Sequence, residues 1–365
     1  MPRIDAFLEL GKQQGGSDIH FTVGQPPLVR LDGDLIPIQY RALSMDETSA
    51  LIAEIIDEAQ RRTFDETGSV DFSYQAVDLG RFRINACYHQ HGVSAFCRVI
   101  PDTVPDLQTL GLPKVVSHFA RLRSGLVLIT GPTGTGKSTT LASLIHQINQ
   151  TLSSSVITLE DPIEFVHTSD KALIVQREVG RHVHSFQDGL RAALREDPDV
   201  ILVGEMRDAD TVSLALTAAE TGHLVLGTLH TRGAAQTIDR IIDAHPSDNQ
   251  AQVRHSLADN LRAVVSQELI RAADGRGRRV VAEVLVVTFA IQQMIREGKT
   301  FQIPGSITTG RRLGMQLMDQ SMLALVRAGE IDPDEAFLKA DDKWGFAPFV
   351  TRPELLALTA GEKAA

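Results

Sequence analysis

The stretch GPTGTGKST, residues 131–139, constrains the fold of this chain more than any other feature. An apolar run, LVLIT, precedes it, and an amphipathic helical pattern follows it. The pattern G-x-x-x-x-G-K-[ST] between a strand and a helix predicts a loop whose backbone N–H groups cradle phosphates. Glycines in such a loop let the backbone approach the phosphates closely. We expect nucleotide binding by Gly131, Pro132, Thr133, Gly134, Thr135, Gly136, Lys137, Ser138 and Thr139.

Two residues of this loop carry specific expectations. Lys137 is expected to reach the β- and γ-phosphates, and Ser138 is expected to bind Mg²⁺. ATP and Mg²⁺ are therefore the predicted cofactors.

The apolar runs LVLIT, VITLE, VILVG and LVLGT alternate with helical patterns. This alternation predicts an α/β fold with a parallel sheet covered on both faces. Before residue 101 the pattern differs, because short β segments surround one helical stretch that begins at Ser44. The expected organisation is an α+β domain over 1–100, a proline-containing linker over 101–113, an ATPase core over 114–288 and a helical region over 289–365.

Acidic residues end two of the apolar runs. VILVGE ends in Glu205, which is expected to orient or deprotonate the attacking water. Gly204 occupies the place where many P-loop proteins have an Mg²⁺-binding aspartate, so another acid is needed. The turn EDPIEF offers Glu160, Asp161 and Glu164, of which Glu164 and Glu160 are preferred, with Glu164 as a metal ligand beside Ser138. The alternative is a solvated acidic turn.

Two histidines, His223 and His230, flank the apolar run LVLGTL. Seven extended residues span about 23 Å, and an odd separation places the side chains on opposite faces. The spacing therefore predicts two separate positions and not one shared metal site. The alternative is a pair of structural histidines, each satisfied by the backbone.

Charge and cysteine content exclude other classes of site. The net charge of −10 argues against nonspecific nucleic-acid binding, which needs a basic face. Two cysteines, Cys87 and Cys97, cannot build a four-cysteine zinc site, and we expect reduced thiols that could be cross-strand neighbours. No apolar run is long enough to span a membrane, and the N-terminus lacks a signal-peptide core. These features predict a cytoplasmic protein without direct membrane insertion.

Four stretches together resemble a known family. GPTGTGKSTTLA, VITLEDPIEFVH, ALREDPDVILVGEMRD and ETGHLVLGTLHT look like the Walker A, Asp box, Walker B and His box of the type II/type IV secretion ATPase superfamily. Within it the chain is similar to the PilT/PilU-like retraction ATPases, since it lacks the four-cysteine insert of the extension branch. The resemblance implies a PAS-like N-terminal domain, a RecA-like P-loop domain with a C-terminal helical cap, and a homo-hexameric ring.

The resemblance also implies roles for individual residues. His230 would sense the γ-phosphate, and His223 would relay to a neighbouring domain. Arg81, Arg83 and Arg98, on strands of the N-terminal domain, would reach nucleotide in the ring. Arg81 and Arg83 are two apart and share a face. The alternatives are solvated rim arginines, and Arg207, beside the Walker B strand, is a candidate for an interface ion pair.

The implied activity is that of an ATP-hydrolysing motor for type IV pilus retraction and twitching motility. It would act at the inner-membrane base of the pilus machine on a PilC-like platform protein, with other pilus ATPases as further candidate partners. A PilU-like accessory motor, a type II secretion-type ATPase and a non-hydrolysing nucleotide-binding ring are the alternatives. Two stretches depart from the family: AIQQMIREGK, 290–299, and the aromatic tail with Trp344, Phe346 and Phe349, which is either packing or a docking surface.

Overall fold

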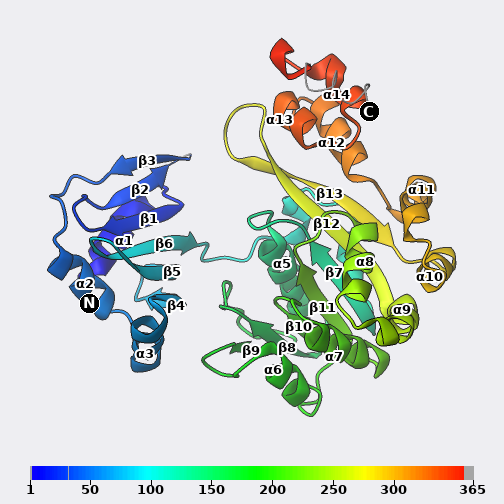
Figure 1. Cartoon of the computed structure of the whole chain (residues 1–365), viewed down its shortest axis with the longest axis horizontal. Coiled ribbons are helices and arrows are strands. Elements are labelled where there is room, and N and C mark those ends of the chain that lie inside the picture. Colours follow the sequence, from blue (N-terminus) through cyan, green and yellow to red (C-terminus); the bar gives the residue numbers. More distant parts are fainter. Residues whose placement is uncertain (1, 32, 357–365) are drawn as a thin grey trace. The chain divides into compact units, whose positions relative to one another are not determined.

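A computed structural model describes residues 2–31 and 33–356, so the last nine residues of the predicted helical region lie outside it. The chain forms two compact units (Figure 1). The first unit comprises Met1–Thr103 together with Pro162–Val166. The second comprises Val104–Asp161 and His167–Ala365. The five-residue segment from the Asp box therefore clusters with the N-terminal unit, which the sequence pattern does not indicate.

The first unit is an antiparallel sheet covered by helices on one face. Its strands follow the order β3-β2-β1-β6-β5-β4, and every neighbouring pair is antiparallel. Apolar residues of α1, α2 and α3 pack with one set of alternating strand residues into a single core. The bounds are α1 Ile4–Gln13, β1 Asp18–Thr22, β2 Leu28–Leu31, β3 Asp34–Pro37, α2 Met45–Ala53, α3 Glu58–Thr67, β4 Ser69–Ala76, β5 Gly80–His89 and β6 Gly92–Ile100.

The other face of this sheet is polar. The register pairs Arg83 with Arg98 and Arg98 with Asp18, so these side chains share the face opposite the core. Arg81 lies on the same face, as its spacing from Arg83 predicts. The two cysteines are not cross-strand neighbours, because Cys97 pairs with Ile84 and Cys87 pairs with Ser94. Cys97 is buried in the core, and this burial raises the pKa of its thiol. Both thiols are free.

The predicted single helix after Ser44 is two helices. The capping box of Ser44 and Glu47 forms as expected and starts α2. A second capping box, Asp57 with Gln60, starts α3, so the intervening residues leave the helix. The signal for this break is present in the sequence, since Asp57 stands three residues before Gln60.

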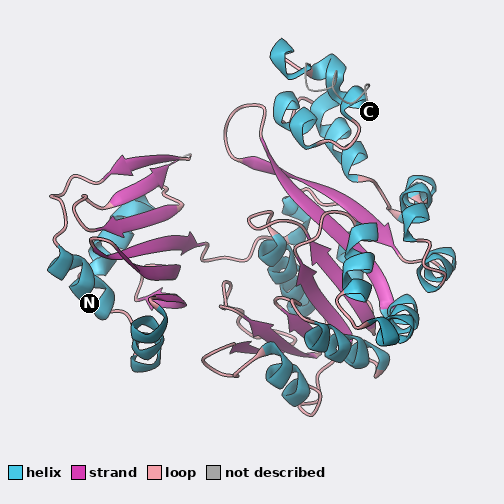
Figure 2. Cartoon of the chain, viewed as in Figure 1, coloured by secondary structure: helices cyan, strands magenta, loops and turns pink. Residues whose placement is uncertain are grey.

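The second unit is built on a mixed sheet of order β13-β12-β7-β11-β10-β8-β9. Figure 2 shows its strands in magenta among helices in cyan. Strands β12, β7, β11, β10, β8 and β9 run parallel to one another. The hairpin β12–β13 adds an antiparallel edge that alternating strands and helices do not predict. The bounds are β7 Gly125–Thr130, β8 Ser155–Glu160, β9 Leu173–Glu178, β10 Val200–Val203, β11 Leu224–Leu229, β12 Leu261–Arg271 and β13 Arg278–Val286.

Helices cover both faces of this sheet and form two apolar cores. Leu107, inside the predicted linker, is buried in one of them, so the linker is only partly a connection. The helices are η1 Leu107–Leu110, α4 Val116–Phe119, α5 Lys137–Thr151, α6 Phe186–Ala193, α7 Ala209–Glu220, α8 Ala234–Asp243, α9 Ser247–Asn260, α10 Phe289–Arg296, η2 Thr300–Gln302, α11 Ile303–Thr309, η3 Arg311–Leu313, α12 Met318–Arg327, α13 Pro333–Lys339, α14 Lys343–Phe346, η4 Ala347–Phe349 and η5 Pro353–Leu356.

The C-terminal helices have a core of their own. Phe346 is 1% exposed and packs in it, and Phe349 packs against it, whereas Trp344 is 52% exposed. The aromatic tail is therefore mainly packing, with one ring at the surface. Among residues 2–31 and 33–356, no helix combines the length and apolar character that crossing a membrane requires.

Candidate functional site

The loop between β7 and α5 has the backbone of a phosphate-binding loop. Gly131, Gly134 and Gly136 have φ of 138°, 80° and 87°, values that favour glycine. A Cβ at Gly131 would lie 2.3 Å from the backbone oxygen of Gln267, so no larger residue fits there. No side chain caps the start of α5, where Gly136 stands at the N-cap. The backbone N–H groups of this helix start therefore suit a bound anion.

Lys137 is folded back onto this loop. Its Nζ donates hydrogen bonds to the carbonyl oxygens of Gly131 and Pro132, at 2.8 and 2.9 Å, and the residue is 8% exposed. The ammonium therefore lies against the backbone of the glycine-rich loop. Ser138 follows at the first turn of α5 and is exposed to solvent.

The end of β10 explains the missing aspartate. The backbone N–H of Gly204 donates to the Leu159 carbonyl at 2.7 Å. A Cβ at position 204 would lie 3.0 Å from that same carbonyl oxygen and 3.3 Å from Cα of Glu160. The close approach of β8 therefore leaves little room for a side chain at this position, and only the next residue can present a carboxylate.

Glu205 presents that carboxylate to two basic side chains. Oε1 lies 3.0 Å from Nε2 of His230 and 2.6 Å from Nε of Arg207, while Arg207 Nη2 donates to Oε2 at 2.6 Å. Partial burial raises the pKa of the Glu205 carboxyl, but the bonds and charge of Arg207, followed by His230, outweigh it and lower that pKa. The carboxylate therefore stays ionised to a lower pH than that of an ordinary glutamate. The contact of Arg207 with Glu205 was missed by sequence analysis, although the Glu-x-Arg spacing at a strand end is its signal.

The two histidines lie at opposite ends of β11, as their spacing predicts. His230 follows the carboxyl end and reaches Glu205. His223 precedes the amino end, where Nδ1 lies 2.9 Å from the Ala218 carbonyl and 3.1 Å from Thr221 Oγ1. These contacts stabilise the turn between α7 and β11. They match the alternative expectation that His223 is a structural histidine satisfied by the backbone. A relay role for His223 stays a prediction.

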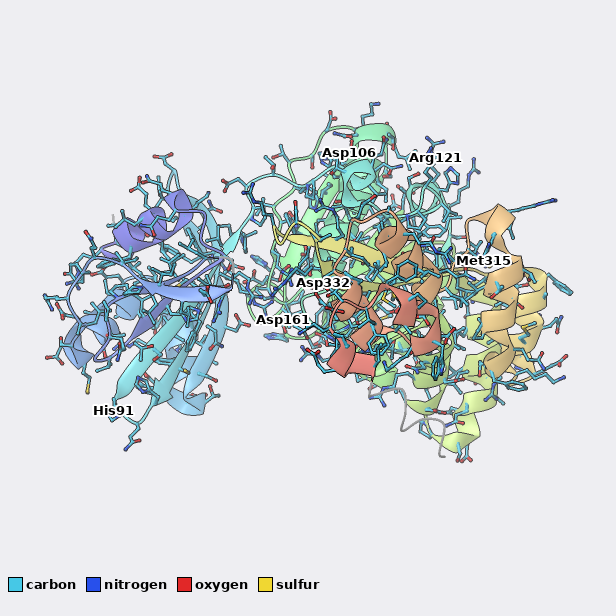
Figure 3. All side chains as sticks on the ribbon, turned by 90° about the horizontal axis from the view of Figure 1, so that it is seen from above. His91, Asp106, Arg121, Asp161, Met315 and Asp332 are labelled. Atoms are coloured by element: carbon cyan, nitrogen blue, oxygen red, sulfur yellow. The ribbon has the colours of Figure 1, made fainter. Side chains whose placement is uncertain are left out.

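The acids of the Asp box fall into two groups. Glu160 ends β8, where its Oε1 accepts hydrogen bonds from Thr158 Oγ1 at 2.7 Å and from Gln176 Nε2 at 3.0 Å. Asp161, labelled in Figure 3, is the last residue of the second unit before the five-residue segment. Glu164 belongs to that segment and therefore to the first unit.

The predicted arginines all lie in the first unit. Arg83 pairs with Asp71 at 2.7 Å and with Glu164 at 3.1 Å, and both bonds raise the pKa of its guanidinium. Arg81 Nε donates to the Ile163 carbonyl at 3.0 Å, and Arg98 pairs with Asp18 at 3.0 Å. Glu164 and Arg83, two residues singled out from distant motifs, are thus brought together, whereas Glu205 and His230 meet in the second unit.

Across residues 2–31 and 33–356, no group of three or more His, Cys, Asp or Glu side chains could hold a metal ion. The exposed hydroxyl of Ser138 at the first turn of α5 fits Mg²⁺ only as an ion shared with nucleotide phosphates and water, which is how Mg²⁺ is commonly bound.

Known proteins share this arrangement over nearly the whole chain. The profile of the Type II/IV secretion system protein family matches residues 2–335. The type IV pilus retraction ATPase PilT of Pseudomonas aeruginosa is 47% identical over 337 residues, which are 92% of this chain and 98% of that protein. The type IV pilus ATPase PilU of the same organism is 39% identical over 338 residues, covering 93% of this chain and 88% of PilU.

A solved structure agrees with both the fold and the sequence. The crystal structure of the pilus retraction motor PilT with bound ADP superposes with a TM-score of 0.85 at 43% identity, covering 94% of this chain and 98% of that one. The second unit is accordingly a RecA-like domain. The chain therefore belongs to the type II/IV secretion system protein family and is one of its P-loop ATPases.

Proposed function

We propose that this ATPase is a homo-hexameric motor that drives type IV pilus retraction, with ATP and Mg²⁺ as its cofactors. One observation carries the proposal. The phosphate loop, Glu205 and His230 follow β7, β10 and β11, which are adjacent parallel strands in the order β7-β11-β10. The carboxyl ends of such strands meet at one edge of the sheet, which is where ligands bind in open α/β folds. The retraction motor PilT shares this sequence and fold over nearly its whole length.

Glu205 would orient the attacking water. The transition state of phosphoryl transfer is loose, so catalysis depends on positioning and electrostatic stabilisation more than on a strong base. A carboxylate with a lowered pKa is a weak base, but it holds a water proton as an acceptor at neutral pH. His230 Nε2, which now contacts Glu205, would turn to the γ-phosphate when ATP is bound.

Lys137 and Ser138 would hold the phosphate end of the nucleotide. The Lys137 ammonium exchanges its bonds to the loop carbonyls for phosphate oxygens, and the Ser138 hydroxyl binds the Mg²⁺. The ion would supply positive charge to the phosphates. Glu164 of the first unit and Glu160 at the end of β8 are the candidate acids that would hold the ion or its water.

Residues of the first unit would complete the site in the ring. We propose that Arg81, Arg83 and Arg98 supply positive charge to nucleotide, since they share the polar face of one sheet. Their acidic partners, Asp71, Glu164 and Asp18, would be exchanged for phosphate oxygens. His223 would act between domains or subunits, from the opposite end of β11.

The proposed partner is a PilC-like platform protein at the cytoplasmic side of the inner membrane, with other pilus ATPases as further partners. The higher identity to PilT than to PilU favours the retraction motor over an accessory role. A secretion-type motor and a non-hydrolysing ring remain as outcomes of the test.

The test combines phosphate release with complementation of a pilus-bearing strain that lacks its retraction ATPase. Wild-type chain should hydrolyse ATP and restore twitching. Glu205→Gln should bind ATP, lower turnover by about 10²–10³-fold and fail to restore twitching, because the amide keeps the shape and loses the charge. Glu196→Gln is the matched control, since that carboxylate pairs with Arg177 at 2.8 Å. Hydrolysis without restored twitching would refute the retraction role, and ATP binding without hydrolysis would leave a regulatory ring.

A further inference from the structure

Two side chains of the β12–β13 hairpin accept hydrogen bonds from the backbone segment that follows His230. Ser266 and Glu283 are directly opposite each other in the register of this hairpin. The N–H of Gly233 donates to Ser266 Oγ at 2.8 Å, and the N–H of Ala234 donates to Glu283 Oε1 at 2.6 Å. A cross-strand pair thus binds two consecutive N–H groups of one loop.

The loop has a conformation that depends on this pair. Gly233 has φ 85° and ψ 152°, which only glycine adopts readily. It stands at the N-cap of α8 and provides no side-chain cap. The carboxylate of Glu283 supplies the missing cap from another strand, where the helix dipole favours a negative charge.

Glu283 also lies near the start of a second helix. Burial raises the pKa of the Glu283 carboxyl, and the nearby backbone N–H groups of Ala234 and of Met318, the first residue of α12, oppose that rise. A partly buried carboxylate is costly, and the hydrogen bond from Ala234 at the start of α8 compensates for it.

Only Thr231, Arg232 and Gly233 separate His230 from the anchored end of α8. Two further contacts tighten this connection, since Thr237 Oγ1 donates to the Gly233 carbonyl and lies 2.7 Å from Thr231 Oγ1. A shift at the start of α8 is therefore passed through a short segment to His230. That imidazole must lie within hydrogen-bond distance of Glu205 or of phosphate to act.

We infer that Glu283, assisted by Ser266, is a positioning residue that sets the place of His230 in the site. The inference rests on the proposed role of His230 in hydrolysis. It assigns a catalytic consequence to a carboxylate outside the four family motifs.

The test measures kcat, KM, ADP affinity and thermal midpoint for oligomers of Glu283→Ala and Glu283→Gln. The alanine variant should lower kcat by about 10-fold or more, because a misplacement of about 1 Å can cost up to about 10²-fold. Its ADP affinity should change by less than about 2-fold, since the phosphate loop is untouched. The glutamine variant should be intermediate, because its one remaining oxygen can still accept the Ala234 N–H.

Glu335→Gln is the matched control, because this carboxylate also accepts a backbone N–H, from Arg271 at 2.9 Å, within the same unit. It should leave kcat unchanged. A loss of kcat in the control equal to that in Glu283→Gln would make the effect general destabilisation and overturn the inference. A folded Glu283→Ala oligomer with wild-type kcat would also overturn it.

A double-mutant cycle separates this inference from the proposed function. If Glu283 acts through His230, Glu283→Ala should cause little further loss in a His230→Ala background. Independent, additive losses would overturn the inference and leave the role of His230 intact. If His230→Ala alone retained wild-type turnover, the proposed sensor role would fail first, and the positioning role would fall with it.

Discussion

The two sheets of this molecule place their functional candidates in different ways. In the second unit, the phosphate loop, Glu205 and His230 follow adjacent parallel strands, so topology alone brings them to one edge. In the first unit, Arg81, Arg83 and Arg98 stand on the open face of an antiparallel sheet. Each of these arginines already has a partner within that unit. Side chains that follow adjacent parallel strands can form a site within one domain. Side chains on a polar sheet face need a second surface opposite them to form one.

The difference is also one of burial. Lys137 is buried, and the Glu205 side chain is 19% exposed, so their charges act at reduced dielectric. The Arg98 side chain is 63% exposed, and an ion pair of that kind is worth little in water. Substitutions in the two regions should therefore differ in both size and concentration dependence.

The largest effect is expected at the strand-end site. Lys137→Ala should lower turnover by more than about 10³-fold and weaken nucleotide affinity, since it removes the charge that meets the phosphates. Phosphate release and ADP titration measure the two effects. Lys171→Ala, on the connection before β9, is the control and should behave as wild type. Near-normal turnover in Lys137→Ala would contradict the binding of the nucleotide phosphates by Lys137.

The next effect tests whether the sheet face needs a second subunit. Arg83→Ala should lower turnover by about 10²-fold or more if this guanidinium stabilises the transition state in the ring. Mixing Arg83→Ala subunits into wild-type rings should depress activity more than simple dilution does. Arg30→Ala is the control from the same sheet, since the Arg30 guanidinium donates to a nearby turn carbonyl, that of Gly33. Full specific activity in an isolated monomer would show that hydrolysis does not require a second subunit.

A smaller effect is expected at the two ends of β11. His230→Ala should lower turnover by about 10-fold while ADP still binds, because it contacts Glu205 and not the phosphate loop. His223→Ala should change turnover by about 2-fold and alter cooperativity in ATP, and neither variant should change zinc content. Steady-state kinetics with ADP titration measure both variants. An equal and complete loss of ADP binding would show that both histidines only support the strand.

The smallest effect is a shift in pH dependence. Arg207 is the main group that lowers the pKa of Glu205, so Glu205 stays ionised as the pH falls below the usual glutamate range. In Arg207→Gln this stabilisation is lost, and the acid limb of the kcat/KM profile should move to higher pH. Arg191→Gln, whose ion pair with Asp188 is on the exposed side of α6, is the control. An unmoved acid limb would mean that Arg207 does not act on the catalytic carboxylate.

Features made by residues close together in the sequence could be predicted, whereas contacts between residues far apart in the sequence could not. The phosphate loop is local, because its glycines, lysine and flanking elements are consecutive in the chain. Glu205 and His230 were predicted because a short apolar strand precedes each of them. Ser266 and Glu283 could not be predicted, since Glu283 meets Ala234 across 49 positions through the register of a hairpin. The pairing of Arg83 with Glu164 is hidden for the same reason, across 81 positions.

One departure from the predicted organisation concerns the Asp box. A domain boundary near residue 100 assumes a continuous N-terminal unit, and the strand pattern there supports that assumption. Ser73 Oγ, however, donates to the Ile163 carbonyl at 2.9 Å, and both Ile163 and Phe165 are buried. The expected ATPase core over 114–288 therefore contains a segment, Pro162–Val166, that belongs to the first unit.

The membership of Pro162–Val166 in the first unit has a consequence for biosynthesis. When the ribosome has completed Thr103, the N-terminal sheet still lacks the segment that accepts bonds from Ser73 and Arg81. At about 5–20 residues per second, the segment follows roughly 3–13 s later. During that interval Arg81 lacks the Ile163 carbonyl and Arg83 lacks the Glu164 carboxylate as hydrogen-bond acceptors. A fragment that ends at Thr103 should lack these contacts permanently, and adding residues 162–166 as a peptide should restore them.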